Sequence, residues 1–273
     1  MPSFEILPGD PNSTVIIHVP HGGLIIPETV RADIVLTNAE LAEESITMSD
    51  IATDQLARDA YVNAGIKPWV FINNYSRLVI DPERFPDERE EMNAVGMGVV
   101  YTKTSDQRML RQPDSDRDAK LVAEYFTRYA EALSNLTAQV REAHQRVTIL
   151  DLHSFAPTAL PYELHKHDAR PALCLGTDDF HTSPTLIDQA HMAFSAVGSI
   201  AIDQPFSGTY VPLAFYKVDA AVQSLMLEIR KDTYAFGDYR AAEYRDVVTA
   251  CIDLVNRIET NEATDLTEAS ALR

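Results

Sequence analysis

The chain has 273 residues, of which 45% are hydrophobic, and this is enough to bury a core without disulfide cross-links. Lysine and arginine number 23 against 41 acidic residues, so the formal net charge of −18 argues against duplex nucleic acid and anionic membrane surfaces as partners. Two cysteines, no export signal and no stretch near the roughly 18 apolar residues of a membrane span lead us to expect a cytoplasmic protein.

The N-terminal part of the chain begins with a strand pattern and continues with a helical one. Residues 14–19 form a β-branched run that stops at a proline, which predicts a buried strand followed by a tight glycine loop. Helix-start signals occur at Asn38 and within residues 45–49. Apolar residues then recur at helical spacing over residues 51–61, and Gly65 ends this predicted helix.

A polar passage separates the next strand from the longest helical pattern. Residues 69–72 are an apolar run and predict a strand, whereas the charged and proline-containing residues 73–91 predict a long loop. Helical periodicity then runs from about residue 116 to 145, and residues 147–152 predict a second buried strand.

The second half of the chain repeats this alternation. Strands are predicted over residues 172–175, 199–202 and 221–229, and helices over residues 185–196 and 239–258. Strands that alternate with helices of a dozen or more residues predict an α/β fold, with a mixed, mostly parallel sheet covered by helices on both faces.

The organisation of the chain predicts one domain. No internal repeat or low-complexity linker divides residues 1–273, and the polar residues 259–273 are expected to form a loosely held tail.

Polar residues end several of the apolar runs, and in open α/β sheets functional sites lie beyond the carboxyl ends of the strands. His21 lies two residues after the first run, and His153 and Glu228 close two others. Asp50, at the predicted start of a helix, can approach the same edge. Two imidazoles and one carboxylate form a zinc ligand set that leaves a position for water, and a further carboxylate can accept the proton of that water. This pattern is typical of a metal-dependent hydrolase.

Each of these residues also has a structural interpretation. A histidine after a strand is commonly a hydrogen-bonded structural residue, and Glu228 could pair with Arg77 or Arg230. Asp50 could be an acidic residue favoured by the helix dipole, and Asp54, one turn later, competes with it for any ligand role.

Three further residues near these motifs are expected to support the site and not to bind metal. His18 is expected in the core or behind a ligand, because its spacing from His21 does not place both rings on one face. Asp151 is expected to point to the opposite face of the strand from His153. Tyr210, after a glycine, either contacts substrate or covers the turn.

Seven short motifs occur in order along the chain. They are HVPHGG (18–23), SDIATD (49–54), YSRLVIDPER (75–84), GMG (96–98), LDLHS (150–154), QPFSGTY (204–210) and LEIR (227–230). Together they resemble the motifs of the N-formylglutamate amidohydrolase family over about residues 14–234. Two motifs differ from the pattern of many members: HGG replaces His-Ser-Gly, and DPER replaces Asp-Leu-Asn-Arg in the region expected to grip substrate.

The resemblance implies a fold, a metal and a catalytic group. The family is similar to zinc carboxypeptidases and to zinc-dependent N-acetylmuramoyl-L-alanine amidases. By this similarity His21, Asp50 and His153 hold zinc, and Glu228 is the general base. A shell of this type also accepts other divalent ions such as cobalt or manganese.

The resemblance further implies hydrolysis of the amide bond of an N-acyl amino acid. The best match is N-formyl-L-glutamate, which gives formate and L-glutamate, a reaction of amino-acid metabolism such as histidine degradation. Arg77 and Arg84 supply planar partners for the carboxylates of such a small anionic substrate, and Tyr210 is a further substrate contact. The alternatives are a peptidase or cell-wall amidase with the same zinc chemistry, and a non-catalytic acid-binding module.

Overall fold

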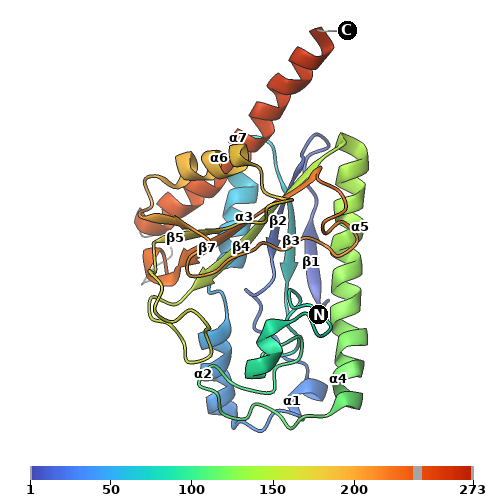
Figure 1. The fold of residues 1–273 in the computed structure, drawn as a ribbon, viewed down its shortest axis with the longest axis vertical. Coiled ribbons are helices and arrows are strands. Elements are labelled where there is room, and N and C mark those ends of the chain that lie inside the picture. The colour runs from blue at the N-terminus through green and yellow to red at the C-terminus, as the bar shows by residue number, and fades with distance from the viewer. Residues whose placement is uncertain (1, 236–241, 272–273) are drawn as a thin grey trace.

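The computed structural model describes residues 2–235 and 242–271. Its centre is a seven-stranded sheet with the order β1–β3–β2–β4–β7–β5–β6 (Figure 1). The strands are β1 (Phe4–Leu7), β2 (Val15–Val19), β3 (Trp69–Asn73), β4 (Val147–Phe155), β5 (Leu173–Gly176), β6 (Ile200–Ile202) and β7 (Val222–Arg230). Strand β1 is antiparallel to β3, and β5 is antiparallel to β7, whereas the other four pairings are parallel. The prediction of a mixed, mostly parallel sheet is therefore confirmed.

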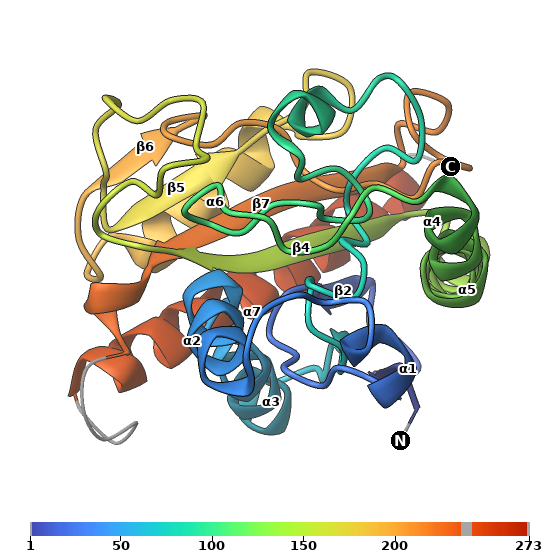
Figure 2. The same cartoon turned by 90° about the horizontal axis from the view of Figure 1, so that it is seen from below.

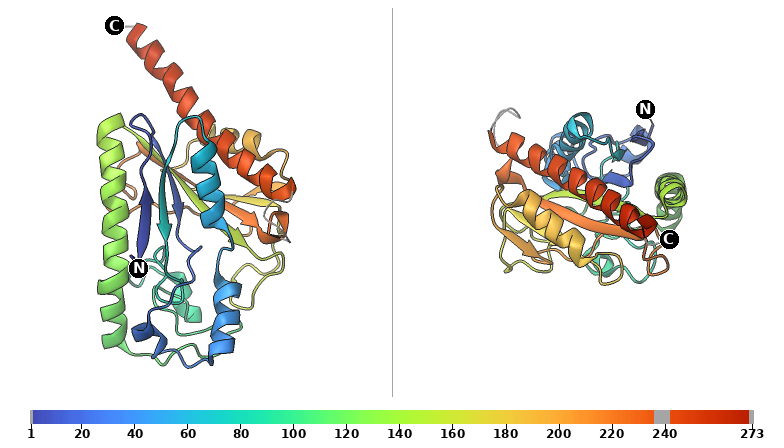
Figure 3. Two further views of the ribbon diagram at one scale, coloured as in Figure 1. Left: turned by 180° about the vertical axis from the view of Figure 1, so that it is seen from behind. Right: turned by 90° about the horizontal axis from the view of Figure 1, so that it is seen from above.

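Helices cover both faces of this sheet, as predicted (Figures 2 and 3). The α-helices are α1 (Glu28–Arg31), α2 (Asn38–Met48), α3 (Thr53–Asn63), α4 (Ser115–Leu121), α5 (Thr127–His144), α6 (Pro184–Phe194) and α7 (Ala242–Ala271). Two 3₁₀ turns, η1 (Glu91–Val95) and η3 (Lys231–Thr233), and a π-turn, η2 (Val122–Phe126), complete the set. Among the residues that the structure describes, no helix combines the length and the apolar character needed to cross a membrane.

The alternation of side chains along the strands divides the core into two layers. On one face Ile17 and Leu150 pack with α3, α6 and α7 in one hydrophobic cluster. On the other face Ile16, Phe71 and Ile149 pack against α5 in a second cluster. Alternate residues toward the carboxyl ends of the strands on the α5 face are polar, and this is where the site described below is formed.

Of the two predicted helix-start signals, the one at Asn38 is confirmed, whereas residues 45–49 begin no helix. Helix α2 starts at Asn38, because the side chain of Thr37 accepts a hydrogen bond from the Glu40 backbone while Glu40 accepts one from the Thr37 backbone. Residues 45–48 form the end of α2, and α3 follows after Ala52, which has a left-handed conformation with φ of 60°. A short non-helical segment that contains Asp50 therefore separates the two helices.

The expected polar tail does not begin at Glu259, which is buried within α7. One oxygen of its carboxylate accepts hydrogen bonds from the Ser13 hydroxyl (2.7 Å) and the Thr14 amide (3.0 Å), and the other accepts one from the Thr14 hydroxyl (3.2 Å). Helix α7 is thus tied to the start of β2, while its C-terminal turns extend beyond the sheet (Figure 1). The predicted start of this helix at Tyr239 lies outside the described residues.

Replacement of Glu259 tests this connection. Glu259→Ala leaves the buried groups at Ser13 and Thr14 without their acceptor, so we expect the free energy of unfolding to fall by about 2 kcal/mol. Glu243→Ala, at an exposed position of the same helix, is the control and should change it by less than about 0.5 kcal/mol. Chemical denaturation measures both variants; equal effects would show that Glu259 has no anchoring role.

Candidate active site

The carboxyl ends of β2, β4 and β7 bring the candidate residues to one edge of the sheet. His21 lies two residues beyond the end of β2, while His153 and Glu228 lie near the ends of the adjacent parallel strands β4 and β7. His153 and Glu228 are direct partners in the register of these two strands, so their side chains point to the same face. The sheet itself therefore fixes the spacing between these two groups.

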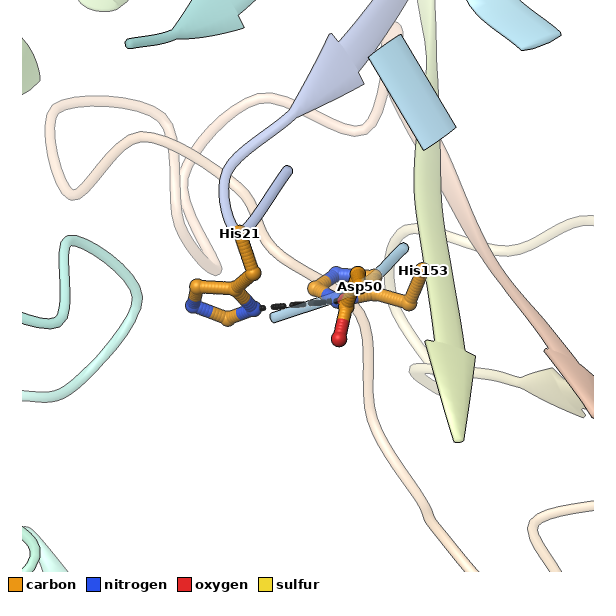
Figure 4. Close-up of side chains that lie close together, drawn as sticks. All are labelled: His21, Asp50 and His153. Atoms are coloured by element: carbon orange, nitrogen blue, oxygen red, sulfur yellow. Dashed lines mark hydrogen bonds and ion pairs between the residues drawn. The ribbon is translucent and has the colours of Figure 1, made fainter. Parts of the chain in front are cut away.

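His21, Asp50 and His153 form a buried group that we call the His–Asp cluster (Figure 4). The Nδ1 atoms of the two histidines lie 3.2 Å apart. The Asp50 Oδ2 atom lies 3.0 Å from Nδ1 of His153 and 3.6 Å from Nδ1 of His21. One atom of each residue thus lies within 4.8 Å of the others, a separation that suits a shared metal ion.

The backbone around Asp50 explains how this carboxylate reaches the histidines. The Asp50 amide donates to the carbonyl oxygen of His21 at 3.0 Å, and the Asp50 carbonyl accepts from the Thr53 hydroxyl at 2.8 Å. Asp50 is therefore held in the segment between α2 and α3, three residues before the first residue of α3, where the sequence predicts it at the start of a helix. Asp54 lies in the first turn of α3 and belongs to none of the candidate metal-binding groups among the described residues.

Carboxylates also contact the outer nitrogens of both histidines. His21 Nε2 lies 2.8 Å from Asp81 Oδ1, and His153 Nε2 lies 3.1 Å from Asp151 Oδ1 and 3.2 Å from Glu83 Oε2. At His21 the hydrogen bond to Asp81 favours the proton on Nε2 and leaves the Nδ1 lone pair directed into the cluster, whereas His153 Nε2 is close to two carboxylates without a hydrogen bond to either.

Two imidazole lone pairs and a carboxylate oxygen at these distances repel one another unless a proton or a cation lies between them. Burial raises the pKa of Asp50, but the hydrogen bonds from His153 and His21 outweigh it and hold that pKa well below its usual range. Burial lowers the pKa of His153, but Glu83 and Asp151 outweigh it and raise that pKa well above its usual value. The donor set therefore fits a divalent cation of the zinc type.

The prediction that Asp151 points away from His153 is wrong. Residues two apart in a strand share a face, so Asp151 and His153 both face α5. Asp151 Oδ1 also lies 2.9 Å from His18 Nδ1, and His18 Nε2 contacts the Tyr129 hydroxyl. His18 is fully buried behind the cluster, as expected for this residue.

Glu228 is half-buried beside the cluster, and its Oε2 atom has no hydrogen-bonding partner among the described residues. Its pKa is raised to about 7, chiefly because the carboxylate is desolvated; His153 opposes this rise and Asp50 adds to it. The structural pairing with an arginine does not occur, because Arg77 lies 2.7 Å from Asp81 and Arg230 lies 2.6 Å from Asp232. An unpaired carboxylate near neutrality can exchange a proton with a molecule at the cluster.

The two candidate arginines have different surroundings. Arg77 donates from Nε to the Tyr101 hydroxyl at 2.9 Å and from Nη2 to Asp81 at 2.7 Å, so Nη1 is left for a ligand. Arg84 makes no hydrogen bond within the described part of the chain. Its nearest carboxylate oxygens are those of Asp81 at 3.4 Å and Glu90 at 3.9 Å.

A cavity of about 220 Å³ joins these groups. The His–Asp cluster, Glu228, Arg77, Arg84 and Lys231 all line it. Tyr210 does not line this cavity: it lines an adjacent one of about 810 Å³, and its ring packs against His18 with 5.0 Å between centroids. The two cavities share Glu83, Arg84, Glu91, Ser207 and Met226. A space of this size suits a small molecule.

Several residues of this cavity have no functional role that could be predicted from the sequence. Asp81 and Glu83 come from the loop after β3, where the sequence has no periodicity that indicates the direction of a side chain. Glu83 stands out in the sequence only because DPER differs from the family motif at this point. Lys231 follows an apolar run and belongs to no motif.

Comparisons with known proteins show which family the chain resembles. A sequence model of the N-formylglutamate amidohydrolase family matches residues 13–235. The crystal structure of an N-formylglutamate amidohydrolase from Ralstonia eutropha is 19% identical, with a TM-score of 0.79 over 96% of this chain and 99% of that chain. That of a gene product from Agrobacterium tumefaciens is 15% identical, with a TM-score of 0.67 over 97% and 96% of the two chains.

More distant comparisons add little. A metallo-carboxypeptidase from Pseudomonas aeruginosa is 12% identical, over 94% of this chain and 60% of that chain, and its TM-score of 0.32 is too low to support an argument. A search of curated proteins gave no match. The family match extends over most of the chain and includes every residue of the His–Asp cluster as well as Glu228. The chain therefore belongs to the N-formylglutamate amidohydrolase family.

Proposed function

We propose that this protein is a zinc-dependent hydrolase of N-acyl amino acids, with N-formyl-L-glutamate as its substrate and formate and L-glutamate as its products. The observation that carries the proposal is the convergence of two histidine Nδ1 atoms and Asp50 beside the unpaired Glu228. Family membership adds the amide bond as the group to be cleaved.

The reaction needs an activated carbonyl and an activated water, because an amide is a poor electrophile. His21, Asp50 and His153 would hold a divalent cation, which would supply Lewis acidity and lower the pKa of a bound water toward about 7. Asp81 orients the His21 imidazole through a hydrogen bond at its outer nitrogen, and Asp151 places a negative charge 3.1 Å from the outer nitrogen of His153.

Glu228 is the proton carrier of this mechanism. Its carboxylate accepts the proton of the attacking water and returns it to the leaving amine, so a single group serves as base and then as acid. Within the described part of the chain, the Oε2 atom of Glu228 has no hydrogen-bonding partner, which leaves it available for the transfer.

Two cationic groups can hold the carboxylates of an N-formylglutamate. Arg84 offers a guanidinium without hydrogen bonds, and Arg77 offers Nη1, so both add binding energy without breaking an existing hydrogen bond. Tyr210 lies beyond Glu83 in the adjacent cavity, and its contact with substrate stays a prediction.

Formate release from a panel of N-formyl amino acids tests the proposal. The zinc-loaded protein should hydrolyse N-formyl-L-glutamate with a kcat/KM at least about 100-fold above that for N-formyl-L-leucine, which offers no side-chain carboxylate for a cation. Hydrolysis of cell-wall peptides in place of the formyl compounds would assign the zinc chemistry to an amidase. Binding without any hydrolysis would assign the chain to a non-catalytic acid-binding module.

Asp81 should affect the affinity for metal. Asp81→Asn weakens the hydrogen bond at His21 Nε2 and removes the negative charge behind it, so we expect zinc affinity to fall about 10- to 100-fold. Asp54→Asn lies outside the candidate metal groups and is the matched control. Competition with a chromophoric chelator measures both constants; unchanged affinity in Asp81→Asn would contradict an orienting role.

A further inference from the structure

Lys231 is a cationic residue that the site has not yet explained. It begins the 3₁₀ turn η3 directly after β7, three residues beyond Glu228. It lines the same cavity as the His–Asp cluster, Arg77 and Arg84. Its position thus places a third positive group beside the proposed reaction centre.

The ammonium group of Lys231 has one partner among the described residues. Its Nζ donates to the carbonyl oxygen of Thr47 at 3.2 Å, near the C-terminus of α2. No carboxylate of the described residues lies within 4.0 Å of Nζ. By contrast, Arg77 has Asp81 at 2.7 Å, and Arg84 has it at 3.4 Å. Of the three lysine and arginine side chains that line this cavity, Lys231 is the one without a carboxylate contact among the described residues.

Such a group is costly to bury, because an ammonium loses water on burial and regains the energy only from a charged or polar partner. Burial lowers the pKa of Lys231, while Asp50 and Glu228 oppose this shift. Two of its three N–H donors make no hydrogen bond within the described chain. The position thus has both the charge and the free donors that a carboxylate ligand needs.

We propose that Lys231 binds one of the two carboxylates of the substrate and that Arg84 binds the other. The inference rests on the proposed function and deepens it, because two separate cationic anchors select a dicarboxylate N-acyl amino acid over a monocarboxylate one. Arg77 is already hydrogen-bonded to Asp81 and Tyr101, so we expect it to contribute less to the preference for a dicarboxylate substrate.

A purely structural role must be separated from this one. A lysine that donates to a carbonyl near the C-terminus of a helix also stabilises that helix, and Thr47 lies three residues before Asp50. Loss of the Thr47 contact would then disturb Asp50 and lower activity on every substrate equally. Binding of a carboxylate predicts an effect that depends on which carboxylate the substrate carries.

Three variants and three substrates make this distinction. Lys231→Gln keeps an N–H donor for Thr47 but removes the charge, Lys231→Met removes both, and Lys231→Arg keeps the charge. The substrates are N-formyl-L-glutamate, N-formyl-L-glutamine, which lacks the side-chain carboxylate, and the N-formyl-L-glutamate α-amide, which lacks the other one.

For Lys231→Gln we expect kcat/KM on N-formyl-L-glutamate to fall at least about 10-fold, as for loss of a charged hydrogen bond. Its kcat/KM on one of the two amides should change less than about threefold, and this amide identifies the carboxylate that Lys231 binds. Lys231→Met should behave in the same way, and Lys231→Arg should restore most of the activity on N-formyl-L-glutamate. Lys120→Gln, at an exposed position of α4, is the control.

An equal loss on all three substrates, or none on N-formyl-L-glutamate, would overturn the inference. Binding of glutarate, a five-carbon dicarboxylate, to the zinc-loaded protein gives a test that does not depend on catalysis. We expect calorimetry to show about 10-fold weaker binding in Lys231→Gln than in the parent. If the parent binds glutarate more tightly than Lys231→Gln but hydrolyses no formyl compound, the proposed function is wrong and the role of Lys231 as a carboxylate-binding residue is supported. If the parent and Lys231→Gln bind glutarate equally, or neither binds it, the role of Lys231 is wrong.

Discussion

Glu228→Gln should lower formate release from N-formyl-L-glutamate by about 100-fold or more while the zinc content stays near that of the parent. The amide has nearly the shape of the carboxylate but cannot accept the proton of the attacking water. The ligand cluster should be unaffected, because Glu228 makes no hydrogen bond to any described residue. Elemental analysis and an initial-rate assay on the same preparation measure both quantities.

The control for this variant is Glu43→Gln, which changes an exposed carboxylate on α2 and should retain the turnover of the parent. Loss of zinc from Glu228→Gln would show that Glu228 is a ligand. Full turnover would show that another group carries the proton. Glu228, which lies opposite His153 in the sheet, would then have only a structural role.

The second large effect is expected at the histidines. His153→Ala removes one of three protein ligands, and two remaining ligands hold zinc poorly, so metal and activity should be lost together. We expect less than about one tenth of the parent's zinc after dialysis, because each missing ligand lowers affinity by orders of magnitude. His21→Ala should give the same result, since both Nδ1 atoms face Asp50.

His167→Ala is the control, because this exposed histidine lies outside the candidate metal groups of the described residues. If His153→Ala kept a full equivalent of zinc, the ion would have to lie elsewhere in the chain. If it lost activity with its zinc intact, His153 would act on the substrate instead of the metal.

The strands of the core and the edge of the site could be predicted from the sequence, because both follow from periodicity. Apolar runs predicted β2, β4 and β7, and the polar residues that close them, His153 and Glu228, are direct neighbours across two parallel strands. Strand β1 (Phe4–Leu7) was missed because it is short, lies at the sheet edge and is only partly buried. The helix-start signal at Asn38 agrees with the beginning of α2, which the structure shows to be capped by Thr37 and Glu40.

The groups that surround the ligands could not be predicted in the same way. Asp81 and Glu83 reach His21 and His153 from a long loop, and only the folded backbone determines where such side chains point. Asp151 was assigned to the wrong face although the strand period of two places it with His153. Lys231 contacts Thr47 across a separation of 184 residues, a distance at which sequence spacing carries no information.

The dependence of formate release on added zinc tests the central claim most directly. Protein stripped with a chelator should release no formate from N-formyl-L-glutamate, and activity should rise in proportion to zinc and reach its plateau at about one equivalent per chain, as expected for one His–Asp–His site. Full activity in the stripped protein, or no formate at any zinc concentration in a folded preparation, would contradict a metal-dependent amidohydrolase built on His21, Asp50 and His153.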